Sequence, residues 1–428
     1  MKWIAWSLGI FLSLIVLWWI LAAPPAELRF AGPTMLGPVP EELNRVLARD
    51  DEVGAGVRRV ADALPGYDDV VLLADGTILA SAMDGWIWRV DGSTGQAERF
   101  ADVPLMPAGL RLAPDDPDVV YFCSAILSGE SYPEAERVGL YALRVSTRQT
   151  QAIVLDVPRE IARSREARVF SRNAPARVEG TRALAFCNDL DVSSDGQRIY
   201  FSEPFAYEGA SMGAGAVAEA IALGSNGRLW MHDRSAGTTR LVARNFHFLD
   251  GVLIEEAPDS SRELSVLVTE TTRFRIQRLF VDGPRAGTHV VLWDDLPGMP
   301  DGLDRDDEGI VWVGLLTLRS DVTDWLHANP WLKGLLVRLP VAWMPRGTST
   351  AVFAFDAKAE RALYLGLHDG SRVRDVSVVI PAGDRLILAS FDPHQRGLVS
   401  IPRPVIGRRS GGDNEWDGDT IRRVETNE

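Results

Sequence analysis

"LADGTILASAMDGWIWRVD", residues 73–91, contains a turn, an apolar strand, a second tight turn and another apolar strand. Its two Asp-Gly pairs are typical of tight turns, and its short apolar runs favour strands. The same pattern recurs five more times, at residues 112–146, 192–233, 262–283, 304–340 and 382–403. In the fifth copy an insertion separates the first strand from a second, which we expect at residues 334–340.

Six copies of one unit decide the fold class. A unit of this kind cannot bury both faces of its small sheet alone, whereas radial packing of the sheets solves the problem and leaves only short edges. We therefore expect an all-β chain folded as a six-bladed β-propeller over residues 66–405. Residues 26–65 are expected to form a connecting segment. The polar tail, 406–428, lacks periodicity and is expected to be disordered.

The N-terminus carries an apolar run from Ile4 to Ala23 after a single Lys2. Twenty helical residues span roughly 30 Å, about one hydrocarbon core. A cleaved signal peptide usually has a shorter apolar region, so an uncleaved transmembrane helix over residues 1–25 is favoured over a signal. Lys2 would remain in the cytoplasm, which makes this a single-pass protein with its propeller on the periplasmic or extracytoplasmic side.

The composition argues against one class of partner and leaves the cysteines open. The formal charge is -14 and the pI about 5.0, whereas nucleic-acid binding requires clustered Lys and Arg. No nucleic-acid partner is expected. Cys123 and Cys187 are the only cysteines. They could form a disulfide, but two buried thiols are the favoured interpretation.

An oxygen-bearing residue recurs at the start of several copies. Asp68, Asn188 and Asp301 each stand seven residues before the acidic residue of an acid-Gly turn. Asp250, in "FLDGVLIEE", begins its copy in the same way, although a longer turn follows. Ala108 occupies the position in the second copy. Because equivalent positions on inner strands face one another in a propeller, the four polar residues are expected to converge at one mouth of the channel.

Three carboxylates and an amide suit a hard cation. Carboxylates brought close together repel one another unless a proton or a cation lies between them. An all-oxygen set suits Ca²⁺ better than Mg²⁺, and zinc is disfavoured because no His or Cys occupies the four positions. The alternative for each residue alone is turn capping, a common role of Asp and Asn. Four in register across separate blades favour a shared calcium site.

Several longer motifs carry a family resemblance. They are "NDLDVSSDGQRIYFSE", "FLDGVLI", "VTETTRFRIQRLFVDGPRAG", "LPGMPDGLDRDDEGIVWVGL", "NPWLKGLLVRLP" and "LILASF". In order and spacing the chain resembles the strictosidine synthase-like, adipocyte plasma membrane-associated protein-like family of the gluconolactonase–paraoxonase calcium propellers. The resemblance implies one calcium held by Glu, Asn, Asn and Asp at blade starts.

The chain departs from the family pattern at several of these positions. Asp68 replaces the usual Glu, Asp250 replaces an Asn, and Gly302 stands where many members carry a second Asn. Val378 occupies the position of the Glu that plant strictosidine synthase uses, so strictosidine synthase activity is not expected. The paraoxonase His pair has no evident equivalent among the six His residues.

The resemblance implies a calcium-dependent hydrolase of esters or lactones. Calcium at the channel mouth would polarise the carbonyl of a small, hydrophobic ester or lactone. Asp301 is the candidate base, because the resemblance gives the matching Asp that role, and His368 is a second candidate. His368 could equally be a packing residue. The competing hypothesis is a non-catalytic propeller that keeps a structural calcium and binds a ligand or partner.

One insertion bears on the substrate. Residues 318–345 carry Trp325, Trp331 and Trp343 among apolar residues. They could form a lid or a membrane-facing patch that receives hydrophobic substrates, or a loop helix packed on the propeller.

Overall fold

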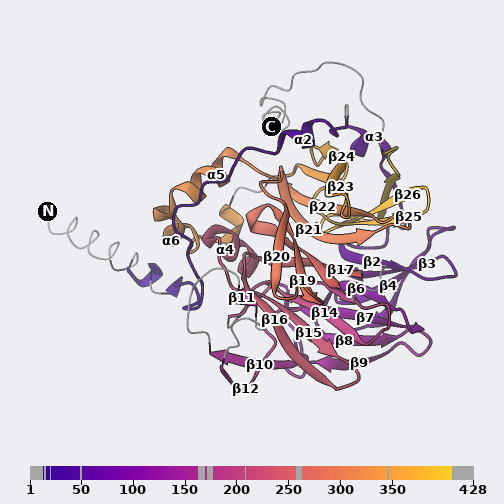
Figure 1. Cartoon of the computed structure of the whole chain (residues 1–428), viewed down its shortest axis with the longest axis horizontal. Helices are drawn as coiled ribbons and strands as arrows, with labels where there is room; N and C mark the ends of the chain where they lie inside the picture. The colour runs from indigo at the N-terminus through magenta and orange to yellow at the C-terminus, as the bar shows by residue number, and fades with distance from the viewer. Residues whose placement is uncertain are drawn as a thin grey trace.

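The computed structural model describes residues 13, 16–19, 21–48, 51–161, 169–170, 177–207, 209–256, 263–344 and 347–406. Strands dominate this part of the chain, and the helices α4, α5 and α6 gather at one side of it (Figure 1). The expected membrane anchor lies mostly outside these residues, as does the tail after Ile406. Within them, no helix has both the length and the apolar character needed to cross a membrane.

The strands form six blades of four, which confirms the propeller. Blade one is β2 (Tyr67–Leu72), β3 (Thr77–Ala82), β4 (Trp86–Asp91) and β5 (Ala97–Asp102). Blade two is β6 (Met106–Ala113), β7 (Asp116–Ala125), β8 (Gly139–Arg144) and β9 (Gln149–Val154). Blade three is β13 (Leu190–Val192), β14 (Arg198–Glu203), β15 (Gly227–Asp233) and β16 (Thr238–Phe246), with β11 (Val169–Phe170) added beyond β16.

The second half repeats the arrangement. Blade four is β17 (Leu249–Glu256), β18 (Leu264–Glu270), β19 (Arg275–Asp282) and β20 (Thr288–Trp293). Blade five is β21 (Gly298–Arg305), β22 (Ile310–Leu318), β23 (Thr350–Asp356) and β24 (Arg361–His368). Blade six takes β25 (Val376–Ala382), β26 (Arg385–Ser390) and β27 (Leu398–Pro402) from the end of the chain. Outside the blades, β10 (Asp156–Ile161) pairs with β12 (Arg177–Ala183).

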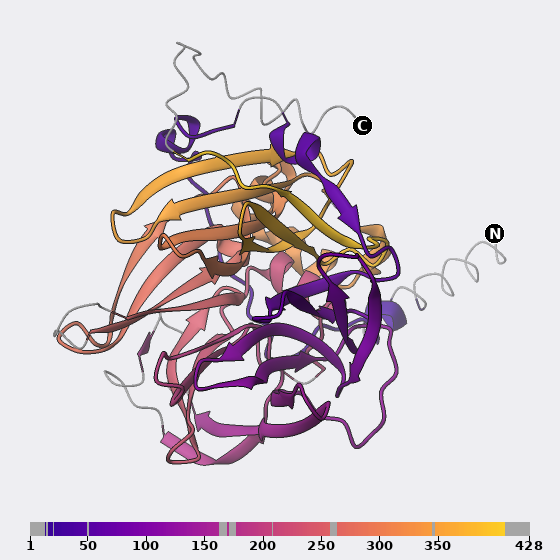
Figure 2. The ribbon, with the colours of Figure 1, turned by 90° about the vertical axis from the view of Figure 1, so that its right-hand side faces the viewer.

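The fourth strand of blade six comes from the other end of the sequence. β1 (Arg58–Val60) pairs antiparallel with β27, with Arg59 opposite Val399. Figure 2 shows this early segment running beside the yellow strands that end the described chain. The propeller therefore begins at Arg58, inside the segment expected only to connect. Blade six therefore combines strands from both ends of the described chain, and this pairing closes the ring.

The apolar core lies between the blades. Six hydrophobic clusters each combine side chains of two neighbouring blades, and the ring includes the junction of blade six with blade one. At that junction Tyr67 and Val70 of β2 pack with Val378 and Ile380 of β25. The face-to-face packing that the repeats predicted is confirmed.

The strand expected at residues 334–340 was a wrong prediction. The insertion of blade five instead forms α5 (Asp321–Ala328), η2 (Pro330–Leu332), α6 (Lys333–Leu336) and η3 (Val341–Trp343). Ser320 begins α5, because its side chain accepts a hydrogen bond from the backbone of Thr323. The sequence of a short apolar run is compatible with either a helix or a strand. Here the run packs against α4 (Ala214–Ala222), and this packing favours the helix. The third strand of blade five lies further on, as β23.

The preference for free thiols was also wrong. Cys123, in β7, and Cys187, just before β13, form a disulfide between blades two and three. Sixty-four residues separate them in sequence, but the packing of these blades brings their Cα atoms to 5.0 Å. Two helices that precede the propeller, α2 (Glu41–Asn44) and α3 (Glu52–Gly56), pack on the outer strand of blade five.

Candidate metal centre

The four predicted ligands stand where the inner strands depart from regular pairing. The β2–β3 register shifts between Tyr67 and Val70, which frees Asp68 from the ladder. Equivalent shifts free Asp250 in β17 and Asp301 in β21. Asn188 lies just ahead of β13. A β-bulge changes the direction in which a side chain points. Because the irregularity recurs at equivalent positions of several blades, it explains how residues with the same place in each repeat come together in one cluster.

Three of the four side chains contact one another directly. Asn188 Nδ2 donates a short hydrogen bond to Asp250 Oδ1, and Asp250 shares a side-chain hydrogen bond with Asp301. Thr271 Oγ1 lies 3.4 Å from the other oxygen of Asp250. Asp68 interacts electrostatically with both Asp250 and Asp301. The structure thus brings residues of blades one, three, four and five together.

Burial gives this cluster its electrostatic character. All four side chains belong to residues buried in the fold. Burial raises the pKa of Asp68 and of Asp301 well above the usual range, and the negative charge of Asp250 raises both further. Burial also raises the pKa of Asp250. No cationic side chain of the described residues is among the groups that shift these pKa values, so a bound cation would stabilise the ionised carboxylates.

The amide supplies an independent sign that the donor set fits a cation. Asn188 Oδ1 is buried and has no hydrogen-bond partner among the described residues. A buried carbonyl oxygen without a donor is costly, and a hard cation would satisfy it. With three carboxylates around it, this oxygen completes a set of the kind that Ca²⁺ prefers.

A second layer of acids surrounds Arg111, which sequence reasoning did not identify. Its Nη1 atom lies 2.9 Å from Asp69 Oδ2, and its Nη2 atom donates to the carbonyl of Leu303 at 2.8 Å. Nη2 and Nε lie 3.9 and 3.8 Å from carboxylate oxygens of Asp189 and Asp191. Arg111 therefore joins blade two to blades one, three and five. An arginine within the otherwise apolar inner strand "MPAGLRLA" was the available signal.

The second-layer acids tie one blade to the next. Asp69 Oδ2 accepts a hydrogen bond from the backbone of Leu110, and Asp189 Oδ2 accepts one from Val252, each at 2.8 Å. Burial raises the pKa of Asp189 to about 8, although Arg111 opposes the rise. Burial likewise raises the pKa of Asp304 to about 6. Because Asp69 and Asp189 follow Asp68 and Asn188 directly, these bonds hold the backbone of two predicted ligands.

His368 is not brought to this cluster. It ends β24, the outer strand of blade five, and its ring accepts a hydrogen bond from the backbone of Arg372 at Nε2. Nδ1 must then carry the proton, which it donates to Asp51 at 2.8 Å. Both ring nitrogens are therefore engaged: Nδ1 ties the start of α3 to the propeller, and Nε2 holds the loop that follows β24.

His368 also belongs to a tighter group of acids. The potential ligand atoms of Asp51, His368 and Asp369 lie within 4.8 Å of one another, a closeness that the carboxylates of Asp68, Asp250 and Asp301 do not reach among the described residues. Wider spacing is expected of like charges with no cation between them. The protonated Nδ1 of His368 and the exposure of both acids argue against a metal at the outer site.

Apolar side chains cover the mouth above the four ligand positions. Met106, Phe186 and Phe248 each stand two residues before a blade-start position, and all three are buried in one cluster. Phe205 packs against Phe186 and Phe248, with ring centroids 5.1 and 5.5 Å away. Residues of α4 join the same cluster. The four predicted ligand positions thus lie beside a cover of aromatic and other apolar side chains.

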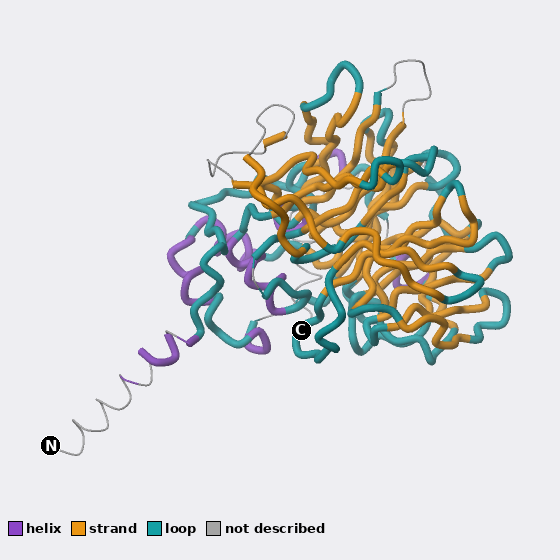
Figure 3. Tube along the Cα trace, turned by 90° about the horizontal axis from the view of Figure 1, so that it is seen from below, coloured by secondary structure: helices purple, strands orange, loops and turns teal. Residues whose placement is uncertain are grey.

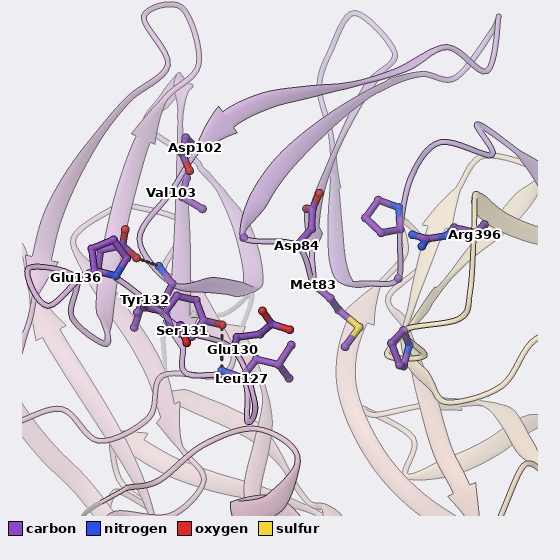
Figure 4. Close-up of a pocket in the computed structure, with 16 residues that line it drawn as sticks. Met83, Asp84, Asp102, Val103, Leu127, Glu130, Ser131, Tyr132, Glu136 and Arg396 are labelled. Carbon is purple, nitrogen blue, oxygen red and sulfur yellow. Dashed lines mark hydrogen bonds between the residues drawn. The ribbon is translucent and has the colours of Figure 1, made fainter.

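An open cleft of about 480 Å³ lies beside this cover, between blades one, two and six. Figure 4 shows Met83, Asp84, Glu130 and Tyr132 around it, with Arg396 on the opposite wall. Its lining includes Gly66, two residues before Asp68, so the cleft opens at the same end of the propeller. None of the four predicted ligands lines it.

The chain is similar in sequence to proteins of two named groups. The chain is 34% identical over 164 residues to an adipocyte plasma membrane-associated protein of Salmo salar, covering 37% of this chain and 38% of that protein. It is 32% identical over 157 residues to a strictosidine synthase-like protein of Arabidopsis thaliana, covering 37% and 40%. Homologues of this chain therefore lie among these two groups. The matched segment spans less than half the length of either relative.

No family model matches the chain. Among solved structures, a gluconolactonase of Xanthomonas campestris aligns with a TM-score of 0.49 and 15% identity, covering 89% of this chain and 98% of that one.

Proposed function

We propose that this protein is a membrane-anchored, calcium-dependent hydrolase of esters or lactones, with the ion held by Asp68, Asn188, Asp250 and Asp301. The supporting observation is the orphaned Oδ1 of Asn188 among three buried carboxyls of raised pKa. An uncharged hydrogen-bonded network would satisfy that oxygen itself, whereas a cation site leaves it free for the ion. The gluconolactonase of Xanthomonas campestris suggests a lactone as substrate by analogy of fold alone.

When bound, Ca²⁺ would supply a Lewis acid for the carbonyl oxygen of the substrate. Asp301 would accept the proton of the attacking water, and its hydrogen bond to Asp250 offers that proton a second carboxylate. Thr271, which contacts Asp250 and donates to the carbonyl of Pro300 at 2.8 Å, would position both acids. The aromatic cover of Phe186, Phe205 and Phe248 would exclude bulk water from the reacting groups.

Membrane attachment belongs to the same proposal. The apolar run Ile4–Ala23 is long enough to span, and the salmon relative is named for its association with the plasma membrane. The propeller would then lie on the extracytoplasmic side, where a disulfide such as Cys123–Cys187 persists.

The test is turnover by the full chain in detergent, on phenyl acetate and a panel of lactones, with and without EDTA. We expect turnover that EDTA removes and calcium restores, and that Asp301→Asn abolishes. Asp75→Asn, an exposed turn acid seven residues after Asp68, serves as the matched control and should retain activity.

Two other outcomes have clear meanings. If calcium raises the melting temperature but no ester or lactone is hydrolysed, the competing hypothesis of a calcium-stabilised binding propeller is correct. If the protein neither contains calcium nor gains stability from it, the metal centre itself is refuted.

A further inference from the structure

Three exposed tryptophans gather on the insertion of blade five. The exposed fractions are 72% for Trp331, 71% for Trp343 and 49% for Trp325, whereas Trp230 and Trp312 of the propeller are fully buried. The rings of Trp325 and Trp331 meet edge to face, with centroids 6.5 Å apart. Scattered exposed apolar residues need no explanation, but three large aromatic side chains on one short segment mark a surface that a partner covers.

The N-terminal segment extends this surface. The backbone N–H of Thr34 donates to the carbonyl of His327 at 2.9 Å, and Arg319 donates to the carbonyl of Gly37 at 3.1 Å. Met35, between these two contacts, is largely exposed. We call the resulting surface the tryptophan face and define it by its exposed apolar side chains: Met35, Val322, Trp325, Trp331, Leu335 and Trp343.

The apolar run of the N-terminus reaches the same face. The guanidinium of Arg338 lies 4.0 Å from the ring centroid of Trp19, which belongs to that run. Val16, Leu17 and Leu21 are exposed beside it. In Figure 3 the helices of the insertion and this N-terminal segment lie on the same side of the strands. The end of the proposed anchor therefore contacts the insertion that carries the tryptophan face.

The tryptophan face also lies over the channel mouth. Lys333 is fully buried and donates to the carbonyl of Ala222, at the end of α4, at 3.3 Å. The backbone N–H of Ala31 donates to the same carbonyl at 3.0 Å. Val337 packs against the apolar cluster that covers the mouth. The insertion thus has one side on the cover of the candidate metal centre and its tryptophans on the other.

We propose that the tryptophan face lies in the interfacial layer of a phospholipid bilayer, with the channel mouth turned toward the lipid. Tryptophan favours this layer, because its ring is apolar while its N–H stays hydrated. Given the hydrolase proposed above, on which this step rests, an apolar ester or lactone would reach the site from the membrane. The charge of -14, with Asp321 and Asp324 on α5, gives no attraction to anionic lipid. Apolar burial must supply the binding, so zwitterionic lipid should suffice.

The experiment uses the full chain, labelled with 5-fluorotryptophan and reconstituted in phosphatidylcholine nanodiscs. Trp325→Phe, Trp331→Phe and Trp343→Phe assign the three ¹⁹F resonances. A lipid carrying a nitroxide near its headgroup should broaden these three, and a water-soluble gadolinium chelate should spare them. Trp86, on blade one, is the internal control and should not respond to the lipid nitroxide.

Each alternative gives a different spectrum. If the chelate broadens the three resonances while the lipid nitroxide affects only tryptophans of the N-terminal apolar segment, namely Trp3, Trp6, Trp18 and Trp19, the anchor stands and the docking surface is refuted. If neither reagent affects the three, protein covers them, as in a second copy of this chain, and the proposal is also refuted. None of these readings depends on turnover, so loss of the hydrolase proposal would leave the docking result intact.

Discussion

A Cβ atom on Gly302 would lie 2.3 Å from Cγ2 of Val378 on the neighbouring blade. Gly302 follows Asp301 directly, and Val378 is buried in the cluster between blades six and one. The backbone of Gly302 does not need a positive φ angle, so the constraint comes from the neighbouring side chain alone. The two departures from the family pattern noted at these positions are therefore coupled: the valine occupies space that a side chain at 302 would require.

Gly302→Ala should destabilise the protein by about 1–3 kcal/mol, because an added methyl group must displace Val378. Combining it with Val378→Ala should cost less than the sum of the two single changes, since the smaller side chain makes room. Urea unfolding of the four proteins measures the coupling. Gly32→Ala is the control, as a Cβ there meets nothing within 4 Å. Additive effects of the two substitutions would contradict the steric explanation.

Asp250→Asn should have opposite effects with and without calcium. In EDTA the variant should be more stable than the wild type by on the order of 1 kcal/mol, because one buried charge facing Asp68 and Asp301 is removed. With calcium it should gain less stability than the wild type does, because a charged ligand is lost. Thermal melts in both conditions measure this, with Asp75→Asn as control. A variant that is less stable in EDTA would refute the repulsion argument.

Arg111→Met should destabilise the protein by about 3–5 kcal/mol, since it leaves the buried carboxylate of Asp69 without its cation. The stability of Arg111→Lys should lie between those of the wild type and Arg111→Met, because a lysine keeps the charge but cannot reach both Asp69 and the carbonyl of Leu303. Arg144→Met breaks an exposed pair with Asp118 and should cost less than about 1 kcal/mol in the same urea titration. Equal costs for the two methionine variants would show that Arg111 is not a structural cation.

Glu219 on α4 should make stability depend on pH. Burial raises its pKa to about 7, from 4.5, although Asn226 donates to it. Between those pH values the folded chain keeps a proton that the unfolded chain has released, so the free energy of unfolding falls as pH rises and levels off above about 7.

Glu219→Gln should remove that dependence. The free energy of unfolding of the variant minus that of the wild type should be larger at pH 8 than at pH 4.5, by up to about 3 kcal/mol. Urea unfolding at the two pH values gives the difference, and Glu98→Gln, at an exposed position of β5, should leave the pH dependence unchanged. A parallel pH profile for Glu219→Gln and the wild type would contradict the assignment.

Local sequence determined the blades and the position of the candidate site within them. Asp-Gly turns and short apolar runs depend on neighbours in the chain, so the repeat could be recognised without coordinates, and equal spacing placed Asp68, Asn188 and Asp301 in register. The structure brings these residues together with Asp250, while the identity of an ion there stays a prediction.

Packing between blades decided the rest. β1 closes the ring, Cys123 contacts Cys187, and Arg111 reaches Leu303 because each pair lies on segments that come close only after the blades assemble. Residues 334–340 form no strand, because their apolar run fits either structure and contact with α4 selected the helix. Turn chemistry acts over a few residues and can be read from the sequence. Contacts between residues 64 to more than 300 positions apart in sequence depend on which surfaces pack against each other in the folded propeller.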